Sequence, residues 1–212
     1  PLNHIITFER FQLSPNKQNK IHVVNSHRSE LSYQTYLELA ISYYNRGLIK
    51  EAITILEIGP DELINDIWKA YLKEDREELI NSISSKKIDF SFPFRRESIK
   101  ILEWAKNTSS SWKLDYLLSL NLWGKGRYTE AQNLLIGIKD ISDNHLFYLN
   151  RGLILNKLGI DPRNDFIKAY ELDNKNWRVS RALSDYHFSN GNYNLSNDIL
   201  RRAFNNDKSN YI

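Results

Sequence analysis

The sequence predicts an all-α protein, an α-solenoid of about four helix–turn–helix units with an irregular middle. Three observations lead to this prediction. The 212 residues include only 8 glycines and 5 prolines, too few for the many turns of a β-sandwich. From Leu31 onward, apolar residues recur with the 3.6-residue period of a helix. One pattern of small and large residues also returns several times along the chain, as it does in repeat proteins.

Composition excludes several classes of protein. An apolar content of 41% with 12% aromatic residues is enough to fill a core, which argues against disorder. The formal net charge of +3 is spread along the chain without a basic face, so nothing favours a nucleic-acid partner. The chain has no cysteine, which excludes disulfides and thiolate metal sites. No apolar run suggests a membrane span, so we expect a soluble protein of either cytoplasm or periplasm.

Residues 1–30 differ from the rest of the chain, since stretches such as Leu13–Lys20 are polar and show no helical period. We interpret them as a lead-in segment, the tail of an upstream domain, with a short extended piece at residues 21–24. Residues 31–212 are then predicted to form one helical repeat domain.

The first pair of helices in this domain is the clearest. One helix runs from about residue 31 to Asn45, Gly47 marks the turn, and the second helix extends to Gly59. The apolar face of the first helix is formed by Tyr36, Leu39, Ala40, Tyr43 and Tyr44.

The middle of the chain, at about 61–110, is predicted to be an irregular insertion. Asp61 is suited to cap a helix that follows it, and residues 76–84 indicate a further short helix. An aromatic loop over residues 84–96 breaks the period before helices resume near Glu97. The phenylalanines of this loop are expected to pack into the solenoid or against an upstream domain; they are Phe90, Phe92 and Phe94.

Three helix pairs share one spacing of small and large residues. They are Tyr36-x2-Leu39-Ala40-x2-Tyr43 with Ala52-x3-Leu56, Asp115-x2-Leu118-Ser119-x2-Leu122 with Ala131-x3-Leu135, and the weaker Ser180-x2-Leu183-Ser184-x2-His187 with Ser196-x3-Leu200. A fourth copy begins at Arg151-Gly152, and its second helix starts early, at Asp161-Pro162. Turn glycines stand at 47, 126, 159 and 191. This spacing resembles the tetratricopeptide repeat, a helix–turn–helix of roughly 34 residues.

The residue types of the repeat have a packing role. Small residues let the two helices of a pair approach closely, and large residues fill the space between neighbouring pairs. Stability therefore comes from stacking. We expect Ala52 and Ala131 to be almost fully buried. A stacked solenoid has a concave face lined by the first helices, which such proteins use to bind peptides or other proteins.

Several phrases resemble one bacterial family of long, uncharacterised proteins, in which a β-rich domain of unknown function precedes tetratricopeptide repeats. The phrases are Pro1-Leu-Asn-His4 with Phe8-Glu9, Phe92-Pro-Phe-Arg95, Leu102-Glu-Trp-Ala105, Trp112-Lys113, and Ala169-x2-Leu172-Asp173 followed by Trp177-Arg178. The resemblance implies that this chain is the helical part of a larger protein. The β-rich domain of that family is similar to sugar-binding or sugar-processing folds, which hints at carbohydrate biology.

No motif for catalysis, a cofactor or a metal is recognisable. The histidines have no ligand spacing on one helical face; they are His4, His22, His27, His145 and His187. His187 occupies an aromatic position of the repeat and is expected to pack. The acidic residues near helix starts are explained by capping and by the helix dipole. We therefore expect no cofactor, no metal and no enzyme activity.

Alignment of the repeats predicts a binding groove, which is lined by the inward-facing positions of the first helix in each repeat. Its residues are Tyr44, Asn45, Tyr116, Trp123, Asn150, Asn156, Lys157, Arg178, Arg181, Asp185 and Phe188. Trp123 could equally pack against the next helix pair. Arg178 and Arg181 are neighbours on one helix face, and either bind a ligand carboxylate or pair with acids of the adjacent helix. Leu37 and Ile41 stand where chaperone-binding members of this repeat class carry their carboxylate clamp, which argues against a chaperone partner.

Two functions remain open at this point. The first is a non-catalytic protein–protein interaction module, which requires an open, partly apolar concave face. The second is an accessory helical domain that packs on a carbohydrate-active enzyme domain of the same precursor. It requires an exposed apolar patch on residues 1–30 or at a solenoid end. An independent enzyme ranks third and would require a deep pocket with convergent acids.

Overall fold

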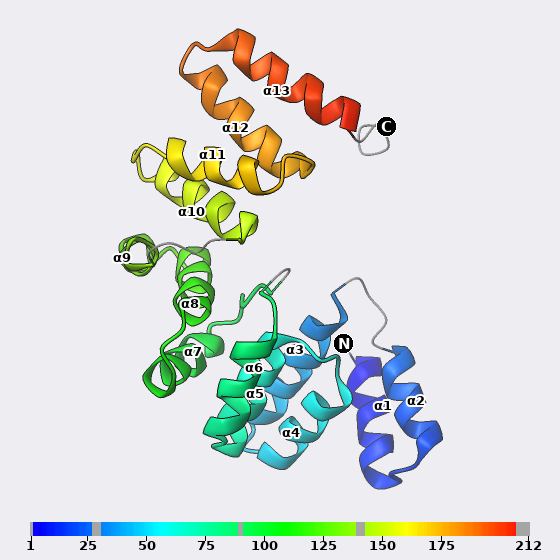
Figure 1. Cartoon of the computed structure of the whole chain (residues 1–212). Coiled ribbons are helices and arrows are strands. Elements are labelled where there is room, and N and C mark those ends of the chain that lie inside the picture. Colours follow the sequence, from blue (N-terminus) through cyan, green and yellow to red (C-terminus); the bar gives the residue numbers. More distant parts are fainter. Residues whose placement is uncertain (1, 27–30, 89–90, 139–142, 207–212) are drawn as a thin grey trace. The chain divides into compact units, whose positions relative to one another are not determined.

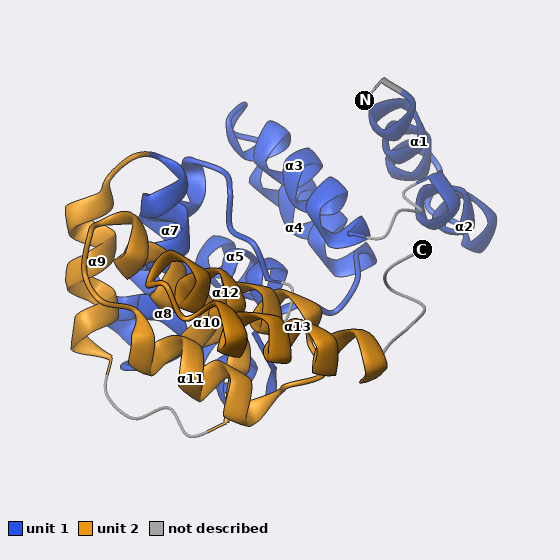
Figure 2. Ribbon diagram, turned by 90° about the horizontal axis from the view of Figure 1, so that it is seen from above, with its two compact units in different colours: residues 1–125 blue, residues 126–212 orange. Residues whose placement is uncertain are grey.

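The computed structural model describes residues 2–26, 31–88, 91–138 and 143–206. These residues form thirteen α-helices and no strand, which confirms the all-α prediction (Figure 1). The chain divides into two compact units, Pro1–Lys125 and Gly126–Ile212 (Figure 2). The division falls inside the predicted repeat domain, 31–212.

The first unit contains eight of the described helices, which pack as consecutive neighbours. They are α1 (Leu2–Leu13), α2 (Lys17–Ser26), α3 (Ser32–Tyr44), α4 (Ile49–Ile58), α5 (Leu63–Lys73), α6 (Arg76–Ser85), α7 (Glu97–Thr108) and α8 (Trp112–Gly124). Within each odd–even pair the two helices contact each other. Successive pairs join where α4 and α7 pack against α5.

The second unit contains the remaining described helices. They are α9 (Tyr128–Gly137), α10 (His145–Lys157), α11 (Arg163–Leu172), α12 (Trp177–Ser189) and α13 (Tyr193–Asn206). Here α10 pairs with α11, α12 pairs with α13, and α11 packs against α12. In the second unit each second helix contacts the first helix that follows it, as α4 does with α5 in the first unit; this is the packing of a solenoid.

The predicted turn glycines all have left-handed backbones. The φ angles of Gly47, Gly126, Gly159 and Gly191 lie between 74° and 77°, a region that glycine adopts without steric cost. After three of them the next amide closes a Schellman motif: Leu48 N donates to the carbonyl of Tyr43, Ile160 N to that of Leu155, and Asn192 N to that of His187. Between α5 and α6 this conformation is adopted by Glu74, with φ 55°.

Small residues meet where two helices of a pair approach. Ala52 and Ala131 are fully buried, as predicted. In the pair α12–α13, the hydroxyl oxygens of Ser184 and Ser196 lie 2.8 Å apart in the core. Either hydroxyl can donate to the other, so both serine side chains are hydrogen-bonded where the helices approach.

The pair α10–α11 also packs closely, but here a very small residue meets a large one. Gly152 of α10 faces the ring of Phe166 in α11, and both residues are buried. A Cβ atom on Gly152 would lie 2.6 Å from this ring. Glycine in the first helix therefore makes room for phenylalanine in the second.

The same pair is joined by a partly buried ion pair. Arg151 of α10 donates to both carboxylate oxygens of Asp165 in α11, at 2.6 to 3.0 Å, and to the carbonyl of Ile138 at 3.1 Å. Its guanidinium carbon also lies 4.8 Å from the centre of the Phe147 ring. The bidentate geometry fixes the rotation of one helix against the other.

The prediction for residues 1–30 was wrong in its local structure. The described part of this segment forms α1 and α2, and residues 21–24 lie within α2 rather than in an extended piece. The reason is tertiary packing. Phe8 is fully buried, its ring centre lies 5.2 Å from that of Tyr43, and the Tyr43 hydroxyl donates to Glu9. The partner of Phe8 lies in another helix, so the sequence pattern of residues 1–30 alone did not reveal this contact.

The irregular middle contains α5, α6 and α7, as the sequence indicated. Trp68 fills its core and donates its indole N–H to Ser98 at 3.0 Å. Of the two alternatives for the phenylalanine loop, packing into the solenoid is not met where the structure describes it, and packing against an upstream domain stays a prediction. Phe92 and Phe94 are 38% and 40% exposed, and Phe90 lies outside the described residues.

A buried carboxylate joins α5 to α6 and to the chain that follows α6. Asp66 accepts hydrogen bonds from Ser82 at 3.0 Å, from Lys69 at 3.1 Å, and from Lys86. Burial opposes its ionisation, but the hydrogen bonds and charges of Lys86 and Lys69 outweigh burial and hold the pKa of Asp66 below its ordinary value. The charged form is therefore the form that stabilises the fold.

The contact between Gly152 and Phe166 generates a first prediction. Gly152→Ala should lower the free energy of unfolding by about 1–3 kcal/mol, because the added methyl group overpacks the pair. Adding Phe166→Leu should recover part of this loss. Urea denaturation of the single and double variants measures both effects. Gly137→Ala is the control, because a Cβ there meets nothing within 4 Å. Unchanged stability of Gly152→Ala would contradict the close approach.

The Asp66 cluster generates a second prediction. Asp66→Asn should lower the free energy of unfolding at pH 7 by about 1–3 kcal/mol, the usual worth of hydrogen bonds to a charged group. The unfolded carboxyl titrates near 3.8 and the folded one below it. The difference in free energy of unfolding between wild type and Asp66→Asn should therefore be largest above pH about 5. It should decrease below pH about 4. Urea denaturation across this range tests the prediction, with Asp198→Asn on the exposed face of α13 as control. A pH-independent difference would contradict it.

Candidate functional site

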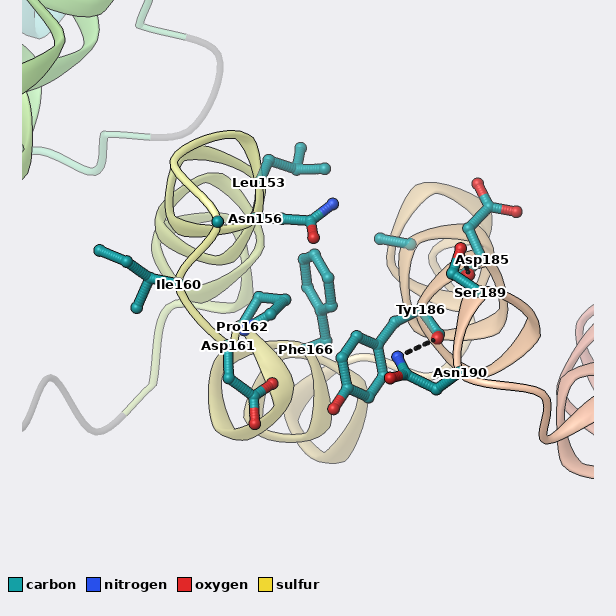
Figure 3. A pocket seen from close by; sticks show the side chains of 12 residues that line it. Leu153, Asn156, Ile160, Asp161, Pro162, Phe166, Asp185, Tyr186, Ser189 and Asn190 are labelled. Carbon is teal, nitrogen blue, oxygen red and sulfur yellow. Dashed lines mark hydrogen bonds between the residues drawn. The ribbon is translucent and has the colours of Figure 1, made fainter.

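A cleft opens between the first helices of the second unit, α10 and α12 (Figure 3). Its volume is about 430 Å³, within the range of ligand-binding sites. The helices α10 and α12 contact each other directly, and α11 packs beneath them against both. The cleft therefore lies on the surface where the adjacent first helices α10 and α12 meet.

The wall from α10 combines an apolar and an amide side chain. Leu153 and Asn156 are three residues apart and share one face of the helix. Leu153 is 46% exposed and Asn156 is also exposed. The floor is the buried ring of Phe166 from α11. Figure 3 shows Asn156 and Phe166 directed into the same space.

The wall from α12 is formed by residues at helical spacing. Ala182, Asp185 and Ser189 follow one another at intervals of three and four residues and line the cleft. Asn190, which caps the end of α12, donates its amide N–H to the carbonyl of Tyr186 at 2.8 Å. This bond holds the Asn190 side chain at the edge of the cleft.

Tyr186 connects the wall to the floor. Its ring centre lies 6.2 Å from that of Phe166, in an edge-to-face arrangement. Two effects raise the pKa of Tyr186. Burial is the larger, and the hydrogen bond to the carboxylate of Asp161 is the second. The phenol is therefore neutral at physiological pH and keeps a hydroxyl group beside the cleft.

The charged groups that line the cleft are both acidic, Asp161 and Asp185. Arg181 lies 3.6 Å from Asp185 on the same helix, but both side chains are about two-thirds exposed. Such a surface pair contributes little energy. The cleft thus offers amides and a hydroxyl for a peptide backbone, an apolar floor, and negative charge for a basic side chain.

The structure brings two of the predicted groove residues, Asn156 and Asp185, into this cleft. Others from the second unit have different surroundings. Arg181 is engaged with Asp185, and Arg178 lies over the ring of Trp177 at 5.8 Å. Phe188 is 61% exposed and contacts the ring of Tyr193. The remaining two, Asn150 and Lys157, are half-buried and exposed, respectively, and do not line the cleft.

The predicted groove residues of the first unit also have different surroundings and do not form one surface. Tyr116 is 3% exposed and belongs to the core, so it offers no surface to a ligand. Trp123 is half-buried. Asn45 donates to Glu97 at 3.1 Å. Tyr44 lines a separate pocket with Tyr71.

Sequence reasoning missed part of the cleft. Phe166 is buried, and its ring forms the floor. Tyr186 follows the predicted Asp185, and Asn190 lies four residues after it at the turn. The signal that was available is this four-residue spacing, which places Asn190 above Tyr186 on one helix face.

In the part of the chain that the structure describes, no cluster of His, Asp and Glu could hold a metal ion. The described helices also include none that is long and apolar enough to cross a membrane.

Comparisons with known proteins identify the fold. No protein-family model and no curated protein matches the chain. Solved structures of MamA are similar. MamA of AMB-1 gives a TM-score of 0.50 at 18% identity, covering 85% of this chain and 94% of that one. MamA of Desulfovibrio magneticus RS-1 gives a TM-score of 0.50 at 12% identity, covering 85% and 97%. A further MamA crystal structure gives 0.51 at 13% identity, covering 81% and 95%.

At these identities the likeness concerns the fold alone. The chain has a tetratricopeptide-like α-solenoid fold, as the sequence predicted. The resemblance to a bacterial family with a β-rich domain stays a prediction.

The buried histidine of α12 generates a third prediction. His187 is buried, as expected, and burial followed by the charge of Arg163 lowers its pKa. Below about pH 6.5 the unfolded chain therefore binds a proton that the folded chain does not. The free energy of unfolding then decreases as the pH is lowered. His187→Phe should reduce this slope between about pH 7 and 5, as measured by urea denaturation. His22→Gln, on the exposed face of α2, should keep it. Equal slopes in wild type and His187→Phe would contradict the assignment.

Proposed function

We propose that this protein is a non-catalytic protein–protein interaction module that binds an extended peptide segment of its partner in the cleft between α10 and α12. The observation that carries the proposal is the composition of the cleft. Amide groups from both walls stand over an apolar floor, between two exposed carboxylates. Peptide-binding surfaces need groups of this kind, because a peptide presents backbone hydrogen-bonding groups together with side chains.

The proposed roles follow from the position of each group. Asn156 from α10 pairs with the backbone of the peptide, since an amide both donates and accepts. Leu153 and Phe166 contact an apolar side chain. Asp185 and Asp161 favour a lysine or arginine in the peptide. Arg181 competes with that cation for Asp185, which reverses the role that the sequence suggested for it.

A second candidate function is an accessory domain that packs on another domain of a larger precursor. One observation favours it. In α13, Ile199 and Ala203 are buried in the contact with α12, whereas Leu200 and Phe204 are 42% and 47% exposed. An apolar helix face at the end of a solenoid is the surface that this function requires. On the resemblance described above, the other domain would act on carbohydrate.

The peptide-binding proposal generates a fourth prediction. A library of random peptides should yield ligands that combine a basic and an apolar side chain. Asp185→Asn should weaken them about 3- to 10-fold, as loss of one hydrogen bond to a charge does, and Asn156→Ala should weaken them by a similar factor. Arg181→Ala should bind basic peptides more tightly than wild type. Isothermal titration calorimetry of each variant with the selected peptides measures these changes.

The matched control is Asn164→Ala, an exposed asparagine of α11 that does not line the cleft. It should bind like wild type. If Asn156→Ala and Asp185→Asn also bind the selected peptides like wild type, the binding surface lies elsewhere. Binding that is lost instead when Leu200 and Phe204 are changed to serine would favour the second candidate function.

A further inference from the structure

The first unit contains a separate pocket lined by aromatic rings. Its volume is about 460 Å³, and its rings belong to Tyr44, Tyr71 and Trp104. These residues come from three different helices, α3, α5 and α7. Ile49 and Leu72 complete the apolar lining. All of these side chains are half-buried, so the pocket is open to solvent.

The rings stand edge to face, one after another. The ring centres of Tyr44 and Tyr71 are 6.4 Å apart, with an interplanar angle of 73°. Those of Tyr71 and Trp104 are 5.3 Å apart, with an angle of 78°. In this arrangement neighbouring rings support each other, and the walls of the pocket keep their positions without a ligand. A flat apolar side chain fits such a preformed site at low entropic cost.

The charges at the pocket are predominantly positive. Arg76 lines it, is exposed, and makes no ion pair within the described part of the chain. The ammonium group of Lys100 lies 5.8 Å from the centre of the Tyr71 ring. Glu74 is the carboxylate of the lining. By contrast, nearby Lys73 is neutralised by Glu57 at 2.8 Å and by Glu78 at 3.7 Å.

These charges decide which ligand the rings accept. Aromatic pockets commonly bind cations through the negative faces of their rings. Here the ammonium group of Lys100 lies beside the Tyr71 ring and hydrogen-bonds to its hydroxyl group, and Arg76 adds a second positive charge at the same pocket. A cationic ligand would be repelled, whereas a carboxylate can form a bidentate pair with the free guanidinium group.

We propose that this pocket is a second binding site, which takes an aromatic side chain of an acidic peptide. The aromatic side chain lies among Tyr44, Tyr71 and Trp104, and a carboxylate next to it in the peptide pairs with Arg76. The site uses no residue of the cleft between α10 and α12. It selects the opposite charge to that cleft, so that a partner with basic and acidic segments could bind both.

The experiment uses three synthetic peptides with capped ends and the sequences Asp-Glu-Phe-Asp-Glu, Asn-Gln-Phe-Asn-Gln and Lys-Arg-Phe-Lys-Arg. The readout is the indole N–H signals of the five tryptophans in nuclear magnetic resonance spectra of the whole chain, with Trp104→Phe to assign one of them. The acidic peptide should shift the Trp104 signal and bind at least about 5-fold more tightly than the neutral peptide at low salt. Added salt should reduce this preference, because the charges are exposed to solvent.

Variants separate the parts of the proposal. Arg76→Gln should bind the acidic and neutral peptides with similar affinity, whereas Arg202→Gln on α13 should keep the preference. Asp185→Asn should leave binding of the acidic peptide unchanged, so that failure of this site and failure of the cleft can be told apart.

Three results would overturn the proposal. The first is tighter binding of the basic peptide, which would make the pocket a cation site. The second is equal binding of an acidic peptide with alanine in place of phenylalanine, which would show a general charge effect. The third is the absence of any shift in the Trp104 signal.

Discussion

The close approach of the two helices in each pair is the contact on which the rest of the structure depends. It requires a small residue in the first helix, and the structure meets this requirement in different ways. Ser184 meets Ser196, whereas Gly152 meets Phe166. In the second case the volume removed from one helix is supplied by the other. The phenylalanine ring then reaches through the pair and becomes the floor of the cleft. The size of one core residue therefore determines both the packing of the pair and the shape of its surface.

Ion pairs fix what apolar contacts leave free, the rotation and register of neighbouring helices. Arg151 with Asp165 does so between α10 and α11, and Asp66 of α5 with Lys86, which follows α6, does so in the irregular middle. Buried pairs of this kind add little net stability, since desolvation offsets their attraction. Their loss is costly because one charge is then left buried alone. They therefore act mainly on the specificity of the packing.

The fold could be predicted from sequence to the extent that it depends on local rules. The turn glycines at 47, 126, 159 and 191 all adopt the left-handed backbone that their position in the repeat requires, and Ala52 and Ala131 are buried. Helix α1 was missed, because its formation depends on the contact of Phe8 with Tyr43, thirty-five residues further on. The site was predicted only in part. Register put Asn156 and Asp185 on first-helix positions, and both line the cleft, but it could not show that Tyr116 is buried, since burial depends on neighbours outside the repeat pattern.

If both proposed sites bind as described, one repeat architecture supports opposite specificities. In both, side chains of adjacent first helices surround an open pocket, and aromatic rings supply the apolar surface. The difference lies in a few charges, Asp161 and Asp185 at one site, Arg76 and Lys100 at the other. None of these four side chains is in the core, so each can change without a cost in packing. In a solenoid the core sets the spacing of the helices, and the exposed positions are left free to determine which partner is bound.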